Sequence, residues 1–170
     1  NDNDGISNDN DTSPNGLRGR VIDGYISGAT VYLDLNYDGQ QNDIEPSSVT
    51  GQNGLFSLNL QTEQEQCLAY APLVVDVPVG AIDSDLGVVS EQFSMVSPPS
   101  LGFLDDRNFV NITPLTSVLW NEIHSLLKDV LGDELSCDLV RDNIRAIDSV
   151  GDSVSSSIQN VVKHYNIPAD

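Results

Sequence analysis

Basic residues are scarce in this chain. Only 7 Lys and Arg residues stand against 26 Asp and Glu residues, which gives a formal net charge of −19 over 170 residues. Nucleic-acid backbones are bound through basic surfaces, so this charge argues against a nucleic-acid partner. A helix that lies on a membrane surface needs basic residues too, and it is disfavoured for the same reason.

Long apolar runs are also missing. No stretch approaches the ~20 apolar residues that span a bilayer. The acidic N-terminus, NDNDGISNDND, is the reverse of a signal peptide, so we expect any signal or lipid anchor to lie outside this chain. The hydrophobic content of 39% is enough for a core, and the length suits one ordinary domain or two small ones. We therefore expect a folded, strongly acidic protein.

Motifs that carry catalysis are absent as well. The sequence contains no G-x-S-x-G, no H-E-x-x-H and no Gly-rich phosphate-binding loop. His124 and His164 fall in predicted helices and have no companion ligands at a spacing suited to zinc. We therefore predict that the protein is not an enzyme. A carboxylate pair of the kind used in glycoside hydrolysis remains a third possibility, because the sequence does not give the separation of its acids in space.

One acidic stretch has the spacing of a calcium-binding loop. An excess of carboxylates serves either to keep a surface hydrated in salty surroundings or to bind hard cations, and alternate spacing favours the second role. Gly39 falls at position 6 of a twelve-residue loop that begins at Asp34, where the sharp turn requires glycine. An acidic hairpin loop without an ion is the alternative. The predicted calcium ligands are Asp34, Asn36, Asp38, Gln40 through its backbone carbonyl, Asn42, and Glu45 as a bidentate carboxylate.

Strands are predicted on both sides of this loop. Residues 29–33 are rich in β-branched and aromatic side chains, and residues 55–60 alternate apolar with polar. Asn53–Gly54 is a dipeptide typical of hairpin turns. The calcium loop is therefore expected to join two strands of a sheet, in contrast to a helix–loop–helix unit.

The loop resembles those of the SdrD B-like repeats of bacterial surface adhesins, down to Gln41 and Asn42 ahead of Glu45. The longer run over residues 19–60, with DGYISGA ahead of the strand, is similar to the prealbumin-like or CnaB-like β-sandwich modules of secreted bacterial proteins. The resemblance implies an extracellular calcium-binding β-sandwich. One departure is that a predicted strand around residues 20–26 precedes the loop, which follows the first strand in the adhesin repeats.

A second acidic stretch opens the chain. It resembles the end of a thrombospondin type 3 repeat, in which acidic side chains wrap calcium with little hydrophobic core. Without a cation, its carboxylates would repel one another and stay extended, so a flexible acidic linker is the alternative. The ligands implied by the resemblance are Asp2, Asp4, Asn8, Asp9 and Asp11.

The composition divides the chain into three parts. Residues 1–16 form the acidic lead-in, residues 17–110 read as short strands, and residues 111–170 carry helical periodicity. Helices are predicted from Thr113–Pro114 to Gly132, over about 133–149 and over about 153–165. The segment 83–87 is either a third cation site or an ordinary turn. The predicted fold class is α+β, an antiparallel β-sandwich of the prealbumin or Ig-like type followed by a three-helix region packed on it.

The chain has two cysteines, Cys67 and Cys137. Calcium-type loops point to a protein outside the cell, where a disulfide is the expected state of such a pair. A bond between Cys67 and Cys137 would close a loop of 70 positions, which contributes roughly 4 kcal/mol to stability on the chain-entropy model. Two buried free thiols are the alternative.

These patterns predict a secreted or cell-surface calcium-binding module with a structural or adhesive role. The alternative is a recognition module or self-assembling surface subunit that binds a glycan or copies of itself through exposed aromatic residues or an unpaired strand edge. Tyr25, Tyr32 and Tyr37 are the aromatic candidates.

Overall fold

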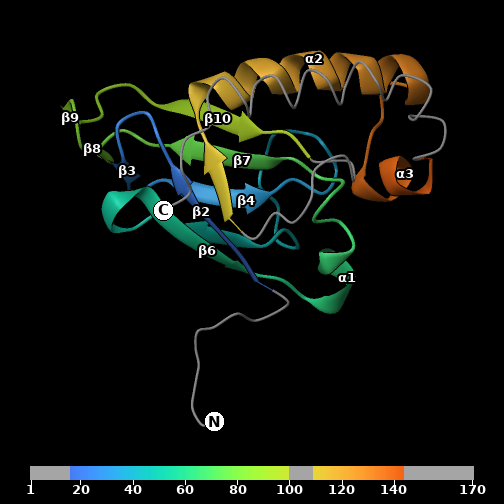
Figure 1. The fold of residues 1–170 in the computed structure, drawn as a ribbon, viewed down its shortest axis with the longest axis horizontal. Coiled ribbons are helices and arrows are strands. Elements are labelled where there is room, and N and C mark those ends of the chain that lie inside the picture. Colours follow the sequence, from blue (N-terminus) through green and yellow to red (C-terminus); the bar gives the residue numbers. More distant parts are fainter. Residues whose placement is uncertain (1–15, 100–108, 144–170) are drawn as a thin grey trace, which may run out of the picture.

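A computed structural model of the chain describes residues 16–99 and 109–143 (Figure 1). These residues form a mixed α/β structure with several small sheets, mostly antiparallel, and three α-helices. Residues 1–15 of the acidic lead-in, residues 144–149 of the predicted second helix and the whole predicted third helix lie outside the described residues.

The largest sheet has four antiparallel strands, and β7 (Leu73–Val77) and β4 (Thr30–Leu33) lie at its centre. The sequence favours an edge position for β7, because Pro72 and Pro78 bracket it. The structure corrects this prediction, since both prolines lie just outside the strand and each residue within it keeps an N–H group for the ladder. In order across the sheet, the strands are β10 (Phe93–Ser97), β7 (Leu73–Val77), β4 (Thr30–Leu33) and β5 (Ser47–Val49).

A second sheet combines one parallel and one antiparallel pair. Its central strand β2 (Gly16–Val21) runs antiparallel to β6 (Leu55–Asn59) and parallel to β11 (Phe109–Ile112). The parallel pair departs from the predicted antiparallel arrangement. The predicted strand over residues 20–26 is also interrupted, because the chain turns back at Gly24, whose φ is 69°, and pairs Ile22 with Tyr25.

A third sheet is built from very short strands, and the turn at Asn53–Gly54 connects different sheets. The third sheet contains β3 (Ile26–Ser27), β8 (Ile82–Asp83) and β9 (Gly87–Val88). Asn53–Gly54 has positive φ at both residues, as expected for its turn, but it ends a 3-10 turn, η1 (Gln52–Gly54), that leads from β5 to β6. Because β5 pairs with β4 and β6 with β2, the predicted hairpin at this point is wrong.

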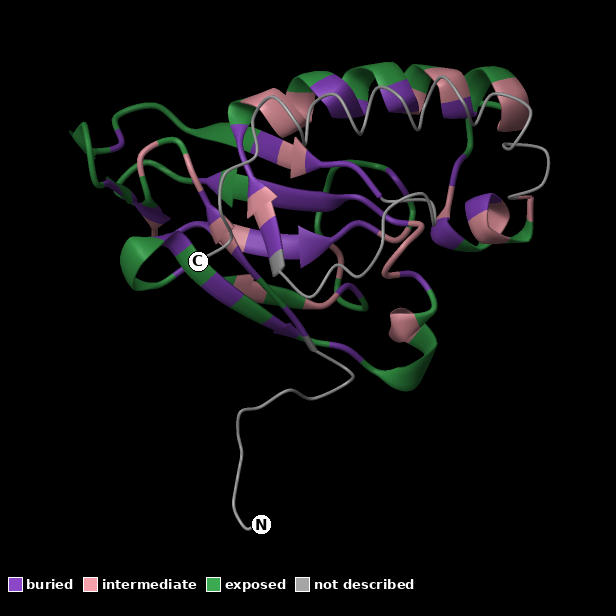
Figure 2. Ribbon diagram, viewed as in Figure 1, coloured by how far each residue is buried: buried purple, intermediate pink, exposed green. Residues whose placement is uncertain are grey.

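One hydrophobic cluster contains side chains from both larger sheets. The alternation predicted over residues 55–60 is confirmed, since Phe56 and Leu58 are buried and their neighbours in β6 are exposed (Figure 2). The side chains of both sheets in this cluster are thereby removed from water. Its strand members include Leu17, Val21, Val31, Leu33, Phe56, Leu58, Val75, Val77, Met95, Val110 and Ile112.

The predicted first helix is confirmed as α2 (Pro114–Leu131). Thr113 and Thr116 form a reciprocal capping box at its N-terminus, and the N–H of Gly132 bonds to the carbonyl of Lys128 at its end, 2.9 Å away. The N–H of Val96 donates to the hydroxyl of Ser117 at 2.9 Å, and the hydroxyl of Thr116 donates to the carbonyl of Val96 at 2.7 Å, which holds α2 against β10 (Figure 1).

The other two helices of the described residues are short. The predicted second helix begins later than expected, as α3 (Cys137–Asp142), because the hydroxyl of Ser136 accepts the N–H of Leu139 and caps it there. The helix α1 (Thr62–Glu65) was not predicted. Among the helices that the structure describes, none combines the length and apolar character that a membrane span requires.

Gly19 lies where two strands of the second sheet leave no room for a side chain. A Cβ atom there would sit 2.2 Å from the carbonyl oxygen of Val110 and 2.6 Å from Cζ of the Phe56 ring. We expect Gly19→Ala to lower the free energy of unfolding by about 2 to 3 kcal/mol, because the clash forces the strands apart. The matched control is Gly51→Ala, where a Cβ meets nothing within 4 Å. Urea unfolding of both variants checks this, and equal losses would contradict it.

Candidate metal centre

The loop predicted to bind calcium joins neighbouring strands of the four-stranded sheet. Asp34 directly follows β4 and Glu45 lies two residues before β5, and these strands pair antiparallel with Tyr32 opposite Ser47. The N–H of Leu33 donates to the carbonyl of Pro46 at 3.1 Å and closes the base of the loop. The strand pair therefore brings the first and last predicted ligands to one place.

Three carboxylates converge inside this loop. One oxygen each from Asp34, Asp38 and Glu45 lies within 4.8 Å of the other two. Asp34 and Glu45 are almost fully buried, at 2% and 4% exposure, whereas Asp38 is exposed. Buried carboxylates are rare unless they are paired or bind a metal. This group therefore has the donor set and the burial of a cation site.

Backbone N–H groups fix the two buried carboxylates in position. The N–H of Gly39 donates to Oδ2 of Asp34 at 2.8 Å, and the φ of 72° at Gly39 explains why glycine is needed there. The two oxygens of Glu45 accept the N–H groups of Leu35 at 2.8 Å and Asn42 at 3.1 Å. The loop is thus curled around its own acidic ends.

The other carboxylate oxygen of Asp34, Oδ1, is buried and has no hydrogen-bond partner. Leaving such an atom unsatisfied costs free energy, because its hydration is lost and nothing replaces it. Burial raises the pKa of Asp34 from 3.8 to about 7, opposed by the Gly39 hydrogen bond and reinforced by the charges of Glu45 and Asp38. A bound cation would supply the missing partner for Oδ1.

The remaining predicted ligands lie along the same loop. Asn36 is exposed, and its side-chain amide donates to Asp38 at 3.2 Å. The side-chain oxygen of Asn42 accepts the N–H of Ile44 at 3.1 Å, and the N–H of Gln40 donates to Asp38 at 2.9 Å. The predicted ligands Asp2, Asp4, Asn8, Asp9 and Asp11 lie outside the described residues.

Tyr37 connects this loop to the helices, a role that the sequence does not reveal. It was a candidate for an exposed aromatic surface, but the structure buries it in a second hydrophobic cluster with Leu119, Trp120 and Ile123 of α2. Its ring lies 5.6 Å from that of Trp120, and its hydroxyl donates to the carbonyl of Tyr70. Only the three-dimensional packing could have shown this, because the contacts are distant in sequence.

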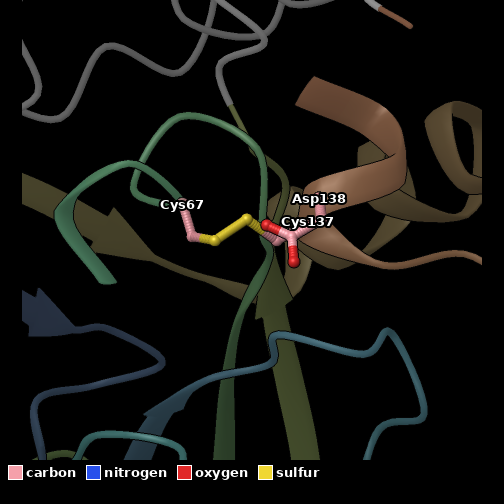
Figure 3. A group of neighbouring side chains, drawn as sticks. All are labelled: Cys67, Cys137 and Asp138. Carbon is pink, nitrogen blue, oxygen red and sulfur yellow. A yellow bond between two sulfur atoms is a disulfide. The ribbon is translucent and has the colours of Figure 1, made fainter. Parts of the chain in front are cut away.

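The predicted disulfide between Cys67 and Cys137 is confirmed. Their Cα atoms are 5.5 Å apart, and the carboxylate of Asp138 lies beside the bond (Figure 3). The bonded sulfurs offer no thiolates, so these three side chains do not form a metal site while the disulfide is intact. The pair ties the segment after α1 to α3.

The acidic segment at 83–87 forms the turn between β8 and β9. Oδ1 of Asp83 accepts the N–H groups of Asp85 at 2.7 Å and Leu86 at 3.1 Å. Within the described ranges, Asp83 and Asp85 belong to no group of three close metal-ligating side chains. This geometry matches the ordinary turn that was the alternative to a third cation site.

The raised pKa of Asp34 predicts how the ion-free chain responds to pH. Between about pH 4 and pH 7 the folded chain holds a proton on Asp34 that the unfolded chain has lost, so this residue makes stability fall as pH rises through that window. We expect Asp34→Asn to reduce this fall. The measurement is urea unfolding at pH 5 and pH 8 with a chelator present. Asp43→Asn, an exposed acid of the same loop, is the control and should keep the wild-type slope.

Comparisons of the chain with protein-family models, with curated proteins and with solved structures found no match.

Proposed function

We propose that this chain is a calcium-binding module of a secreted or cell-surface protein, with a structural or adhesive role. One observation carries the proposal. Three carboxylates of a twelve-residue loop converge within 4.8 Å, and one of them, that of Asp34, has a buried oxygen without a hydrogen-bond partner. A divalent cation would satisfy this oxygen and neutralise charges that otherwise repel one another.

Calcium suits these donors better than the other common cations. The side-chain ligands of this loop are oxygens, which do not favour soft metals, and its twelve residues include no histidine. Calcium accepts 6–8 oxygens in irregular arrangements, whereas magnesium demands near-octahedral geometry. The spacing of Asp34, Asn36, Asp38 and Glu45 around the turn at Gly39 follows the calcium-loop pattern.

Two further features support an extracellular module. The Cys67–Cys137 disulfide is the state favoured in oxidising compartments. The single hydrophobic cluster shared by the two larger sheets is consistent with the β-sandwich of the prealbumin-like or CnaB-like modules that the sequence resembles. In this proposal the ion stiffens the loop, and the module contributes to the structure of a surface or to adhesion.

Calcium should stabilise the protein against heat. With a Kd of about 10⁻⁴ to 10⁻³ M, typical of extracellular modules, 10 mM calcium would add roughly 1.4 to 2.7 kcal/mol by mass action. We expect Asp34→Ala and Glu45→Gln to abolish most of the increase in Tm, because each removes a converging carboxylate. Asp43→Asn should retain the increase.

Thermal unfolding in calcium and in EGTA measures this effect, and calorimetric titration gives the stoichiometry. Superimposable wild-type melting curves, with no heat of binding in the titration, would refute calcium binding.

A self-assembling or recognition role is the second candidate, and the exposed apolar side chains of the β8–β9 hairpin favour it. In the described part of the chain β9 is the outer strand of its sheet, and Leu86 and Val88 are 86% and 67% exposed. Of the three candidate tyrosines only Tyr25 is exposed, which weakens the case for an aromatic glycan platform.

If copies associate through the β8–β9 hairpin, Val88→Lys should lower the mass seen by light scattering. A wild-type chain that is monomeric at high concentration would argue against association.

A further inference from the structure

The proposed calcium loop is held from outside by the segment 61–72, which contains α1. The side-chain amide of Gln64 donates to the carbonyl of Ile44 at 2.9 Å. The N–H of Asp34 donates to the carbonyl of Pro72 at 2.9 Å, and the hydroxyl of Tyr37 donates to the carbonyl of Tyr70. These contacts fall at positions 1, 4 and 11 of the twelve-residue loop, so the segment supports it near both ends.

The disulfide lies at the centre of this support. Cys67 sits within the segment, and its carbonyl accepts the N–H groups of Tyr70 at 3.0 Å and Ala71 at 2.9 Å. Cys137, on the other side of the bond, donates its N–H to the carbonyl of Leu35 at 2.8 Å. The disulfide therefore joins two elements that contact the loop independently.

The contact at Leu35 leads directly to a proposed calcium ligand. The carbonyl of Leu35 accepts the N–H of Cys137, and the N–H of Leu35 donates to Oε2 of Glu45 at 2.8 Å. Both cysteines also line a cleft of about 650 Å³ together with Leu35, Asn42 and Ile44. Loss of the covalent bond would leave the exposed hydrogen bond from Arg141 to Gln66, at 3.2 Å, between α3 and the segment after α1, and would loosen the peptide that orients Glu45.

We propose that the Cys67–Cys137 disulfide and the calcium loop are thermodynamically linked, so that the intact disulfide raises calcium affinity and bound calcium protects the disulfide from reduction. This inference rests on the proposed function, since it concerns regulation of the same site. Linkage is reciprocal, so the factor by which the disulfide raises affinity equals the factor by which calcium shifts the thiol–disulfide equilibrium.

The redox step has a simple balance. A dithiol such as dithiothreitol transfers two electrons and two protons, the Cys67–Cys137 bond breaks to give two thiols, and the dithiol closes into its cyclic disulfide. Calcium is not consumed. It acts only by binding the disulfide form more tightly than the dithiol form.

The test equilibrates the full chain with mixtures of reduced and oxidised dithiothreitol, in saturating calcium and in EGTA. Free thiols are then counted by alkylation and mass spectrometry. We expect calcium to raise the ratio of reduced to oxidised reagent at the midpoint by about tenfold. Asp43→Asn should keep this shift and Glu45→Gln should lose it. Sodium chloride at matched ionic strength should not reproduce it.

Calorimetry on the wild type separates the possible failures. Calcium binding with equal midpoints in the two conditions would overturn the linkage and leave the proposed function intact. No calcium binding would overturn both. The reciprocal measurement is the calcium Kd of the Cys67→Ser, Cys137→Ser double variant, which should be higher than that of the wild type by the same factor. Circular dichroism checks that the double variant is folded.

Discussion

Negative charges held at one point are the constraint on which this structure depends. Oxygens of Asp34, Asp38 and Glu45 lie within 4.8 Å of one another. Two like unit charges about 5 Å apart repel by roughly 3 kcal/mol at the effective dielectric near a protein surface. Paired strands at both ends of the loop keep these groups from separating. Backbone N–H groups bond to several of these carboxylate oxygens, but Oδ1 of Asp34 has no hydrogen-bond partner.

The candidate site could be predicted from the sequence because its determinants are local. Ligand spacing and the glycine at position 39 define the loop within twelve residues, and the structure brings three of its acids together. The capping of α2 by Thr113 was also predictable, since a cap depends on residues within one turn. The disulfide followed from the expected compartment and from the presence of two cysteines only.

Long-range features could not be predicted in the same way. The parallel pairing of β11 with β2 and the central place of β7 are decided by which strands meet across the core. Pro72 and Pro78 led to the wrong prediction of an edge strand, because each lies just outside β7 and removes no N–H group from it. The turn at Asn53–Gly54 has the expected dihedral angles, yet it connects two sheets because its neighbours find partners elsewhere. Local chemistry determined the turn, and tertiary packing determined what it connects.

The burial of Tyr37 has a spectroscopic consequence. The chain has a single tryptophan, Trp120, and its ring lies 5.6 Å from that of Tyr37 and stacks on His124 at 4.6 Å. Indole emission is sensitive to the polarity and the quenching groups in its immediate surroundings. All tryptophan fluorescence of this protein therefore originates beside the acidic loop, which gives the molecule an intrinsic optical reporter that needs no attached label.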